Sequence, residues 1–338
     1  MGRFTSILCA SVYVLGASND IRAADFPTFN GAVSPFDKPV MLQLRPHPIA
    51  KASKKTTAYF STGTEKNNFE TLVTAKTEAI KSGDEIIHTY EPLAMSVQML
   101  GQKQEHKVPP MIIRMRMSAR NNFIDIETDF QNMSDGEKSP ITQYMPIVLK
   151  FLNSATKLFP VNGVREGHYF YNITESEINL DEYFPARYLN DNQYIQLKQN
   201  LKFSFKGVAG GITTYREREV IFVKISGEVR VKDVHSNKGS VNLFVQINGY
   251  SLLDTFTGRM VLTDVLYKGK GTFEDFKFSG EGHEIMNLEL NSLTENKLKL
   301  SGDSLQKMNL PKAKKECAQL GFKTGTEAYG DCVMKLYK

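Results

Sequence analysis

Apolar and polar residues alternate along most of the chain between about residues 56 and 300. Successive side chains of a β-strand point to opposite faces of a sheet, so this alternation is typical of strands with one apolar and one polar face. The composition, with 41% hydrophobic and 23% charged residues, is that of a globular protein. We therefore predict an α+β, mostly β fold, with a large curved antiparallel sheet or open barrel and a covering helix.

The clearest alternation lies in residues 111–130, MIIRMRMSARNNFIDIETDF. Asn121 and Asn122 tolerate the positive φ that a tight turn needs, so the segment is expected to fold back as a hairpin. Either a two-residue or a four-residue loop would place arginines opposite carboxylates on one face. The other face is apolar and is our candidate ligand-binding wall, formed by Ile113, Met115, Met117, Ile124 and Ile126.

The methionines of this region raise the alternative of a metal site. Thioether sulfur binds Cu(I), and five methionines fall in adjoining predicted strands: Met95, Met99, Met111, Met115 and Met117. No histidine or cysteine directly adjoins them. On the same face as Ile113, they fill a core or a cavity wall as soft apolar groups. We therefore favour the apolar wall and predict no metal site and no cofactor.

Further strands are predicted on both sides of a single long helical pattern. The predicted pairs are residues 68–80 with 85–99, and 220–231 with 240–250. A turn at 254–258 separates two later strands, and the polar segments 271–279 and 284–300 are expected to form an edge. We divide the chain into a signal peptide (1–23), a first set of strands (24–138), a covering helix (139–160), a second set of strands (161–305) and a C-terminal helical hairpin (306–338).

The helix is predicted from apolar residues at helical spacing in residues 147–159. Pro146 would kink the helix or open its main part, and Pro160 would end it. Such a helix most simply covers one face of a curved sheet.

Residues 1–23 have the pattern of a secretory signal peptide. Arg3 supplies a positive charge, residues 7–17 are apolar, and Ala23 is a suitable last residue of the removed segment. The apolar run is shorter than the roughly 20 residues that span a bilayer, and no later segment is apolar enough to span one. The alternative is a buried first strand or helix. We predict a periplasmic or secreted protein; the net charge of +5 is too small to indicate a nucleic-acid partner.

Residues 306–338 carry the two cysteines that remain after Cys9 is removed with the signal peptide. Pro311 can begin a helix, and Thr324 with Glu327 forms a capping box for a second one. An antiparallel pair of helices would bring Cys317 and Cys332 together, and an oxidising compartment would favour a disulfide. A zinc site is the alternative, but two cysteines without a nearby histidine supply only half of its ligands.

This tail resembles cysteine-bracketed C-terminal segments of exported bacterial proteins. The residues that carry the resemblance are Cys317, Gly321, Phe322, Gly325, Thr326 and Cys332. Residues 159–268 resemble uncharacterised periplasmic β-proteins that are similar to open barrels of the lipoprotein-carrier type. There the matching residues are Gly167, Asp254, Thr257 and Gly258. The resemblance implies export and a curved antiparallel sheet closed over by a helix.

Motifs of common enzymes are missing from the sequence, which contains no H-E-x-x-H, no G-x-S-x-G, no G-x-G-x-x-G and no P-loop. The six histidines, at 47, 88, 106, 168, 235 and 283, are widely separated. Carboxylates at 175, 177, 181 and 182 are interpreted as a solvated face rather than an acid–base pair. Residues 216–219, Arg-Glu-Arg-Glu, are interpreted as a solvated strand edge rather than an anion-binding patch. We predict no catalytic residues.

The combined pattern favours an exported, non-enzymatic binding or structural protein of the cell envelope. A curved sheet with one apolar face suits an apolar or lipid-like ligand, or an envelope protein as partner. The alternative is a secreted hydrolase whose site is assembled from distant strands, because catalytic triads are defined by geometry rather than by sequence spacing.

Overall fold

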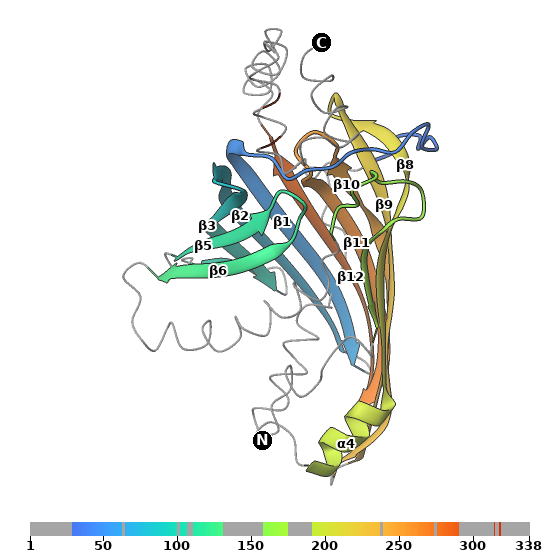
Figure 1. The fold of residues 1–338 in the computed structure, drawn as a ribbon. Coiled ribbons are helices and arrows are strands. Elements are labelled where there is room, and N and C mark those ends of the chain that lie inside the picture. Colours follow the sequence, from blue (N-terminus) through green and yellow to red (C-terminus); the bar gives the residue numbers. More distant parts are fainter. Residues whose placement is uncertain are drawn as a thin grey trace. The chain divides into compact units, whose positions relative to one another are not determined.

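The computed structural model describes residues 29–62, 65–99, 102–106, 111–130, 158–174, 191–236, 239–273 and 276–290, together with Lys314 and Ala318. Contacts between Cα atoms divide the chain into two units, residues 1–290 and 291–338. The fold described below is that of the first unit (Figure 1).

The described part of this unit consists almost wholly of strands, with one short helix. The elements are β1 (His47–Thr62), β2 (Glu65–Ser82), β3 (Glu85–Met99), β4 (Gln102–His106), β5 (Met111–Ser118), β6 (Phe123–Phe130), β7 (Tyr169–Thr174), α4 (Asp191–Asn200), β8 (Leu201–Tyr215), β9 (Arg218–Ser236), β10 (Gly239–Asp254), β11 (Met260–Phe273) and β12 (Phe276–Glu289).

All of these strands belong to one antiparallel sheet that does not close. Their order is β6-β5-β3-β2-β1-β12-β11-β10-β9-β8-β7, and β4 pairs with β3. The first and last long strands, β1 and β12, lie side by side near the middle, in register from Lys51 opposite Glu289 to Thr62 opposite Phe278 (Figure 1). The two predicted sets of strands therefore form a single sheet, and the predicted mostly β, antiparallel fold class is confirmed.

The register gives the sheet an apolar and a polar face, because cross-strand partners point to the same side. Val229 pairs with Val245, and Val231 with Leu243. We call the face that carries these side chains the inner face. The opposite, outer face of β9 carries Lys224, Glu228, Arg230 and Lys232.

The sheet bends toward its inner face. Tyr171 of β7 contacts Met260 of β11, with 3.6 Å between Oη and Sδ, although four strand positions separate the two strands. Arg259 reaches His88 of β3 in the same way. One core cluster unites inner-face residues from both halves of the sheet, including Ile86 of β3 and Val223 of β9. The inner face is therefore concave.

Residues 29–46 cross one end of the sheet and form what we call the strap. Ser34 forms a β-bridge with Ile212, and Val40 with Val164. Further along, Leu44 N donates to Ala119 O at 2.7 Å and Arg45 N donates to Thr257 O at 3.1 Å. The strap thus ties β8 to the β5–β6 turn and to the β10–β11 turn. The opposite, distal end of the sheet carries the β9–β10 and β11–β12 hairpins.

Several sequence predictions are corrected or refined by these strands. The segments 271–279 and 284–300 were expected at an edge, but β12 is a central strand between β1 and β11. Arg216 and Glu217 form the β8–β9 turn, with φ of 50° and 64°, rather than a strand. Helix α4 was not predicted; Leu197 anchors it against a cluster of buried valines, Val231, Val234 and Val241.

Other predictions lie outside the described residues. These are the signal peptide (1–23), residues 139–157 of the covering helix, the carboxylates at 175–182, and the C-terminal hairpin with Cys317 and Cys332. The last three residues of the predicted helix, 158–160, have no regular secondary structure. Lys314 and Ala318 are both helical.

Candidate ligand-binding site

The inner face is almost free of charge. Away from the strand ends, its described positions carry Lys, Arg, Asp or Glu only at Lys54 and Glu284. These two side chains neutralise each other, with 2.8 Å between Nζ and Oε2. Because an unpaired charge is costly to remove from water, a surface of this kind favours an apolar partner over a charged one.

Aromatic and β-branched side chains line this face between β7 and β11. Ile225, Val245, Ile247 and Val265 form a buried floor, and partly buried aromatic residues pack against it: Tyr171, Phe205 and Tyr267. The rings of Tyr171 and Phe205 stack with centroids 5.5 Å apart. Burial raises the pKa of Tyr171 to about 12 and raises that of Tyr267 as well. Both phenols are therefore neutral at physiological pH.

Glycines leave room on the inner face of β11. Gly269 pairs with Val245 on one side and Gly280 on the other. A Cβ at Gly269 would meet its nearest neighbours, Val245 Cγ2 and Phe244 O, at 3.5 and 3.7 Å, which are ordinary contact distances. A larger side chain at this position would therefore extend into the space above the inner face without displacing the backbone.

A buried polar cluster lies on the inner face at the strapped end. The guanidinium of Arg259 contacts both ring nitrogens of His88, whose residue is 3% exposed. His47 Nδ1 donates to Pro48 O at 2.8 Å. Burial, together with a smaller effect of the charge of Arg259, lowers the pKa of His47 to about 4. Burial also lowers the pKa of Arg259 to about 9, which leaves it charged at neutral pH.

The predicted wall residues lie on β5 and β6. Met115 pairs with Ile126 and Ile113 with Thr128, so the methionines face inward as predicted from the alternation. A β-bulge between Arg116 and Met117 places Phe123, rather than Ile124, opposite Met117. Ile124 is 42% exposed. The binding role of Ile113, Met115, Met117, Ile124 and Ile126 stays a prediction.

The ion pairs predicted for this hairpin are present on its outer face. In register, Arg114 lies opposite Glu127 and Arg116 opposite Asp125. Arg116 lies 3.7 Å from Asp125 and also binds Glu85 of β3, with 2.8 Å between Nε and Oε2. The polar face of the hairpin is thus neutralised locally.

The sequence did not indicate His88, Arg259 or Tyr171 as site residues. His88 and Arg259 are 171 positions apart in the sequence, so no local motif can join them. A weaker signal existed in the alternation, because His88 follows Ile86 on a face that is otherwise apolar. In the sequence no histidine directly adjoins the methionines, but in the sheet His88 is the cross-strand partner of Met115. The Arg259 cation beside His88 disfavours a copper ion there.

An acid–histidine pair on the outer face is the arrangement closest to catalytic machinery. His283 Nε2 lies 2.7 Å from Asp264 Oδ1, and Tyr250 Oη donates to Asp264 Oδ2 at 3.2 Å. A hydrolytic triad also needs a nucleophile beside the histidine. No described serine or cysteine is hydrogen-bonded to His283. Within the described ranges, no group of three or more His, Cys, Asp or Glu side chains could hold a metal ion.

No family model matches this sequence, and no curated protein matches it. Solved structures with partial similarity include lipovitellin, from a study of lipid–protein interactions, with a TM-score of 0.38, 8% identity, and 73% of this chain aligned. The aligned region is 25% of the lipovitellin chain. The β-domain of the Bordetella autotransporter BrkA has a TM-score of 0.24 at 4% identity, with 71% of this chain and 99% of that chain covered. Pseudomonas aeruginosa OccK5 has a TM-score of 0.20 at 6% identity, with 72% and 98% covered.

With TM-scores below 0.5, none of these likenesses assigns the chain to a family or an activity. Within the described residues, no helix has the length and apolarity needed to cross a membrane.

Proposed function

We propose that this chain is an exported, non-enzymatic binding protein of the cell envelope that holds an apolar or lipid-like ligand against the inner face of its sheet. The observation that carries the proposal is the contrast between the two faces. The inner face pairs its two charges away from the strand ends, and between β7 and β11 it is lined by aliphatic, aromatic and small residues; its buried polar cluster of His88 and Arg259 lies at the strapped end. Each ligand methylene that leaves water on such a surface contributes about 0.8 kcal/mol.

Export is supported by the sequence. Residues 1–23 have the pattern of a signal peptide, and Cys317 and Cys332 fit a disulfide in an oxidising compartment. The resemblance to open barrels of the lipoprotein-carrier type, carried by Gly167 and residues 254–258, is consistent with the same setting. A periplasmic or secreted location is part of this proposal.

The test begins with native mass spectrometry of the mature protein purified from its own envelope. We expect a co-purifying apolar ligand in the native chain. In Gly269→Trp the new ring would occupy the space above the inner face, so we expect the ligand to be lost and the affinity for a fluorescent fatty-acid analogue to fall at least about tenfold. Leu266→Trp is the matched control, because Leu266 lies on the outer face of the same strand and is exposed.

Two results would contradict the proposal. One is a clean apo mass after gentle extraction, together with no binding of the fatty-acid analogue. The other is equal loss of binding in the two tryptophan variants, which would indicate damage to the sheet rather than a filled site. Ester turnover without any retained ligand would instead support the hydrolase alternative.

A further inference from the structure

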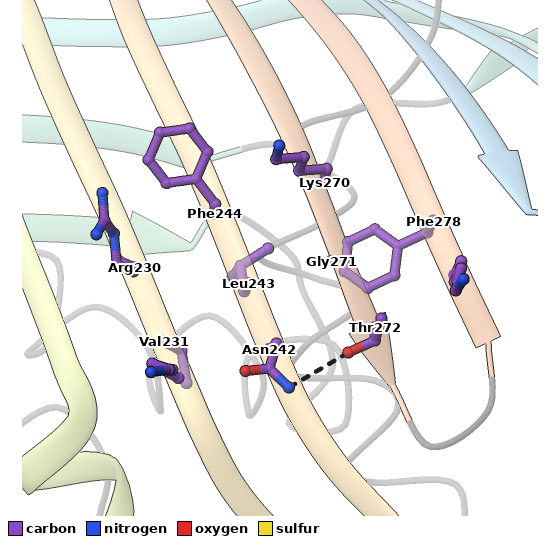
Figure 2. Close-up of a pocket in the computed structure, with 11 residues that line it drawn as sticks. Arg230, Val231, Asn242, Leu243, Phe244, Lys270, Gly271, Thr272 and Phe278 are labelled. Atoms are coloured by element: carbon purple, nitrogen blue, oxygen red, sulfur yellow. Dashed lines mark hydrogen bonds between the residues drawn. The ribbon is translucent and has the colours of Figure 1, made fainter.

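Cations on the outer face of the sheet lie among acidic residues. Figure 2 shows Arg230 and Lys270 in one row across this face, near the distal end. Arg230 has Glu228 at 2.9 Å, and the sequence places residues 274–275, Glu-Asp, shortly after Lys270. Arg259 differs from these cations, because its guanidinium lies at the strapped end against a buried histidine of the inner face.

Most of the hydrogen-bond donors of Arg259 are unused. A guanidinium carries five N–H donors. Among the described residues, the hydrogen-bond contacts of this one are to Nδ1 and Nε2 of His88. A neutral imidazole accepts at only one of its two ring nitrogens, so it satisfies at most one donor. Nε of Arg259 is excluded from solvent and has no partner within the described part of the chain. The site therefore lacks acceptors.

The positive charge of Arg259 is also uncompensated by the described residues. Asp254, the acid at the other end of the β10–β11 turn, binds Thr257 and Arg218 instead. Burial lowers the pKa of Arg259 to about 9, and no described acid counteracts this effect. Arg259 is thus charged at neutral pH, while the neighbouring His47 is neutral because burial lowers its pKa to about 4. Since a buried charge without a partner is costly, an external anion would stabilise the site.

Apolar side chains adjoin this site on two sides. Met115 is the cross-strand partner of His88 and is partly exposed, so the inner face is open to solvent beside the site. On the other side Met260 directly follows Arg259 and contacts Tyr171, with 3.6 Å between Sδ and Oη. Tyr171 in turn packs against the buried floor of the inner face. The unsatisfied cation therefore lies where the apolar lining begins.

We propose that Arg259 binds the anionic head group of an amphiphilic ligand, such as the carboxylate of a fatty acid, while the acyl chain lies along the inner face. A guanidinium can donate two parallel hydrogen bonds to a carboxylate, and binding through Nε would satisfy the donor that now lacks a partner. From Arg259 to Val265 of the floor, β11 extends about 20 Å, a length that suits a long acyl chain. This head-group site rests on the proposed function, because it has no role unless the inner face holds an acyl chain.

Binding assays on the full chain with two matched probes test the proposal. The probes are a fluorescent long-chain fatty acid and its methyl ester, which has the same chain without the charge. We expect the native chain to bind the acid at least about tenfold more tightly than the ester, the factor expected for a hydrogen bond to a charged group. In Arg259→Gln we expect the acid to bind no better than the ester, with the affinity for the ester unchanged.

Arg45→Gln is the matched control. Arg45 is another arginine of the strapped end, but its guanidinium carbon lies 4.5 Å from the centroid of the Phe256 ring. The control therefore makes the same change in net charge away from His88, and we expect it to keep the preference for the acid. Arg259→Lys gives a second test if Arg259→Gln fails to fold. A lysine keeps the charge but not the paired donors, so we expect a smaller preference than in the native chain.

The outcomes separate this proposal from the proposed function. Equal affinity of the native chain for acid and ester, or a preference that survives in Arg259→Gln, would overturn the head-group site alone. Binding of neither probe would contradict the proposed function as well. Gly269→Trp is expected to weaken both probes alike, because it fills the space for the chain and leaves the head-group site in place. Acetate that displaces the acid as effectively as an unlabelled fatty acid would identify a site for free anions and contradict the proposal.

Discussion

The two halves of the sheet have the same alternating sequence pattern but differ in burial. In the late half, β8–β12, core side chains on both faces are excluded from solvent at the strapped end, including Val220, Ile221, Val223, Leu252 and Leu262. In the early half, β1–β6, every residue of β5 remains partly exposed. Alternation determines which face a side chain occupies, whereas segments from elsewhere in the chain determine whether that face is covered.

The strap explains much of the difference at its own end of the sheet. Phe29 packs against the cluster that contains Val220, Leu252 and Leu262, and its ring lies 6.0 Å from that of Tyr250. This contact covers the outer face of the late half. We infer that the late half contributes most of the stability at the strapped end, where the methionine-lined strand β5 of the early half stays partly exposed.

The largest effect that would sharpen this comparison is expected at Asp254, which is 1% exposed. Its carboxylate accepts hydrogen bonds from Thr257 N at 2.6 Å and Arg218 Nη1 at 3.2 Å. Asp254→Ala breaks a buried ion pair with Arg218 and is expected to lower the free energy of unfolding by about 4 kcal/mol, measured in urea. Asp125→Ala on β6, where the carboxylate is half exposed, serves as control and should change it little. Equal losses would contradict the assignment of stability to the late half.

A direct comparison of apolar truncations is expected to give the next largest difference. Leu252 is fully buried, and Leu252→Ala should cost about 3 kcal/mol because it removes contacts and leaves a cavity. Met115 is only partly buried, so Met115→Ala should cost about 1 kcal/mol. The measurement is urea unfolding at constant m-value, and a larger loss at Met115 would reverse the ranking of the two halves.

Local features of the fold were predictable because short stretches of sequence determine them. Asn121 has a φ of 65°, as the predicted turn between β5 and β6 requires. The predicted placement of arginines opposite carboxylates across these two strands is confirmed. Long-range pairing has no comparable local signal. The polarity of β12 suggested an edge, but a central strand can be polar when its outer face meets solvent and its inner face carries glycines such as Gly280 and Gly282.

The candidate site shows the same limit. Alternation placed Met115 and Ile113 on the inner face, but the bulge that displaces Ile124 depends on how β6 meets β5. Arg216 and Glu217 continued the alternating charges, yet they adopt left-handed conformations in the turn. Such conformations are uncommon for these residue types, so the connection between two long strands determines them rather than local preference.

The smallest of the three effects is expected at His47, where the two halves meet beside Arg259. The folded-state pKa of His47 is about 4, mainly because of burial, against an ordinary value of 6.5. Between these values the unfolded chain binds more protons than the folded one, so stability is complete above pH 6.5 and falls as the pH decreases. By about pH 5 this residue should have cost about 2 kcal/mol. His47→Gln cannot be protonated and should flatten the pH dependence of unfolding in urea, whereas the exposed control His235→Gln should keep it. If the pH dependence of the free energy of unfolding were the same in His47→Gln as in the native chain, His47 and the junction between the halves would be open to water. Burial of the late half would then not depend on this junction.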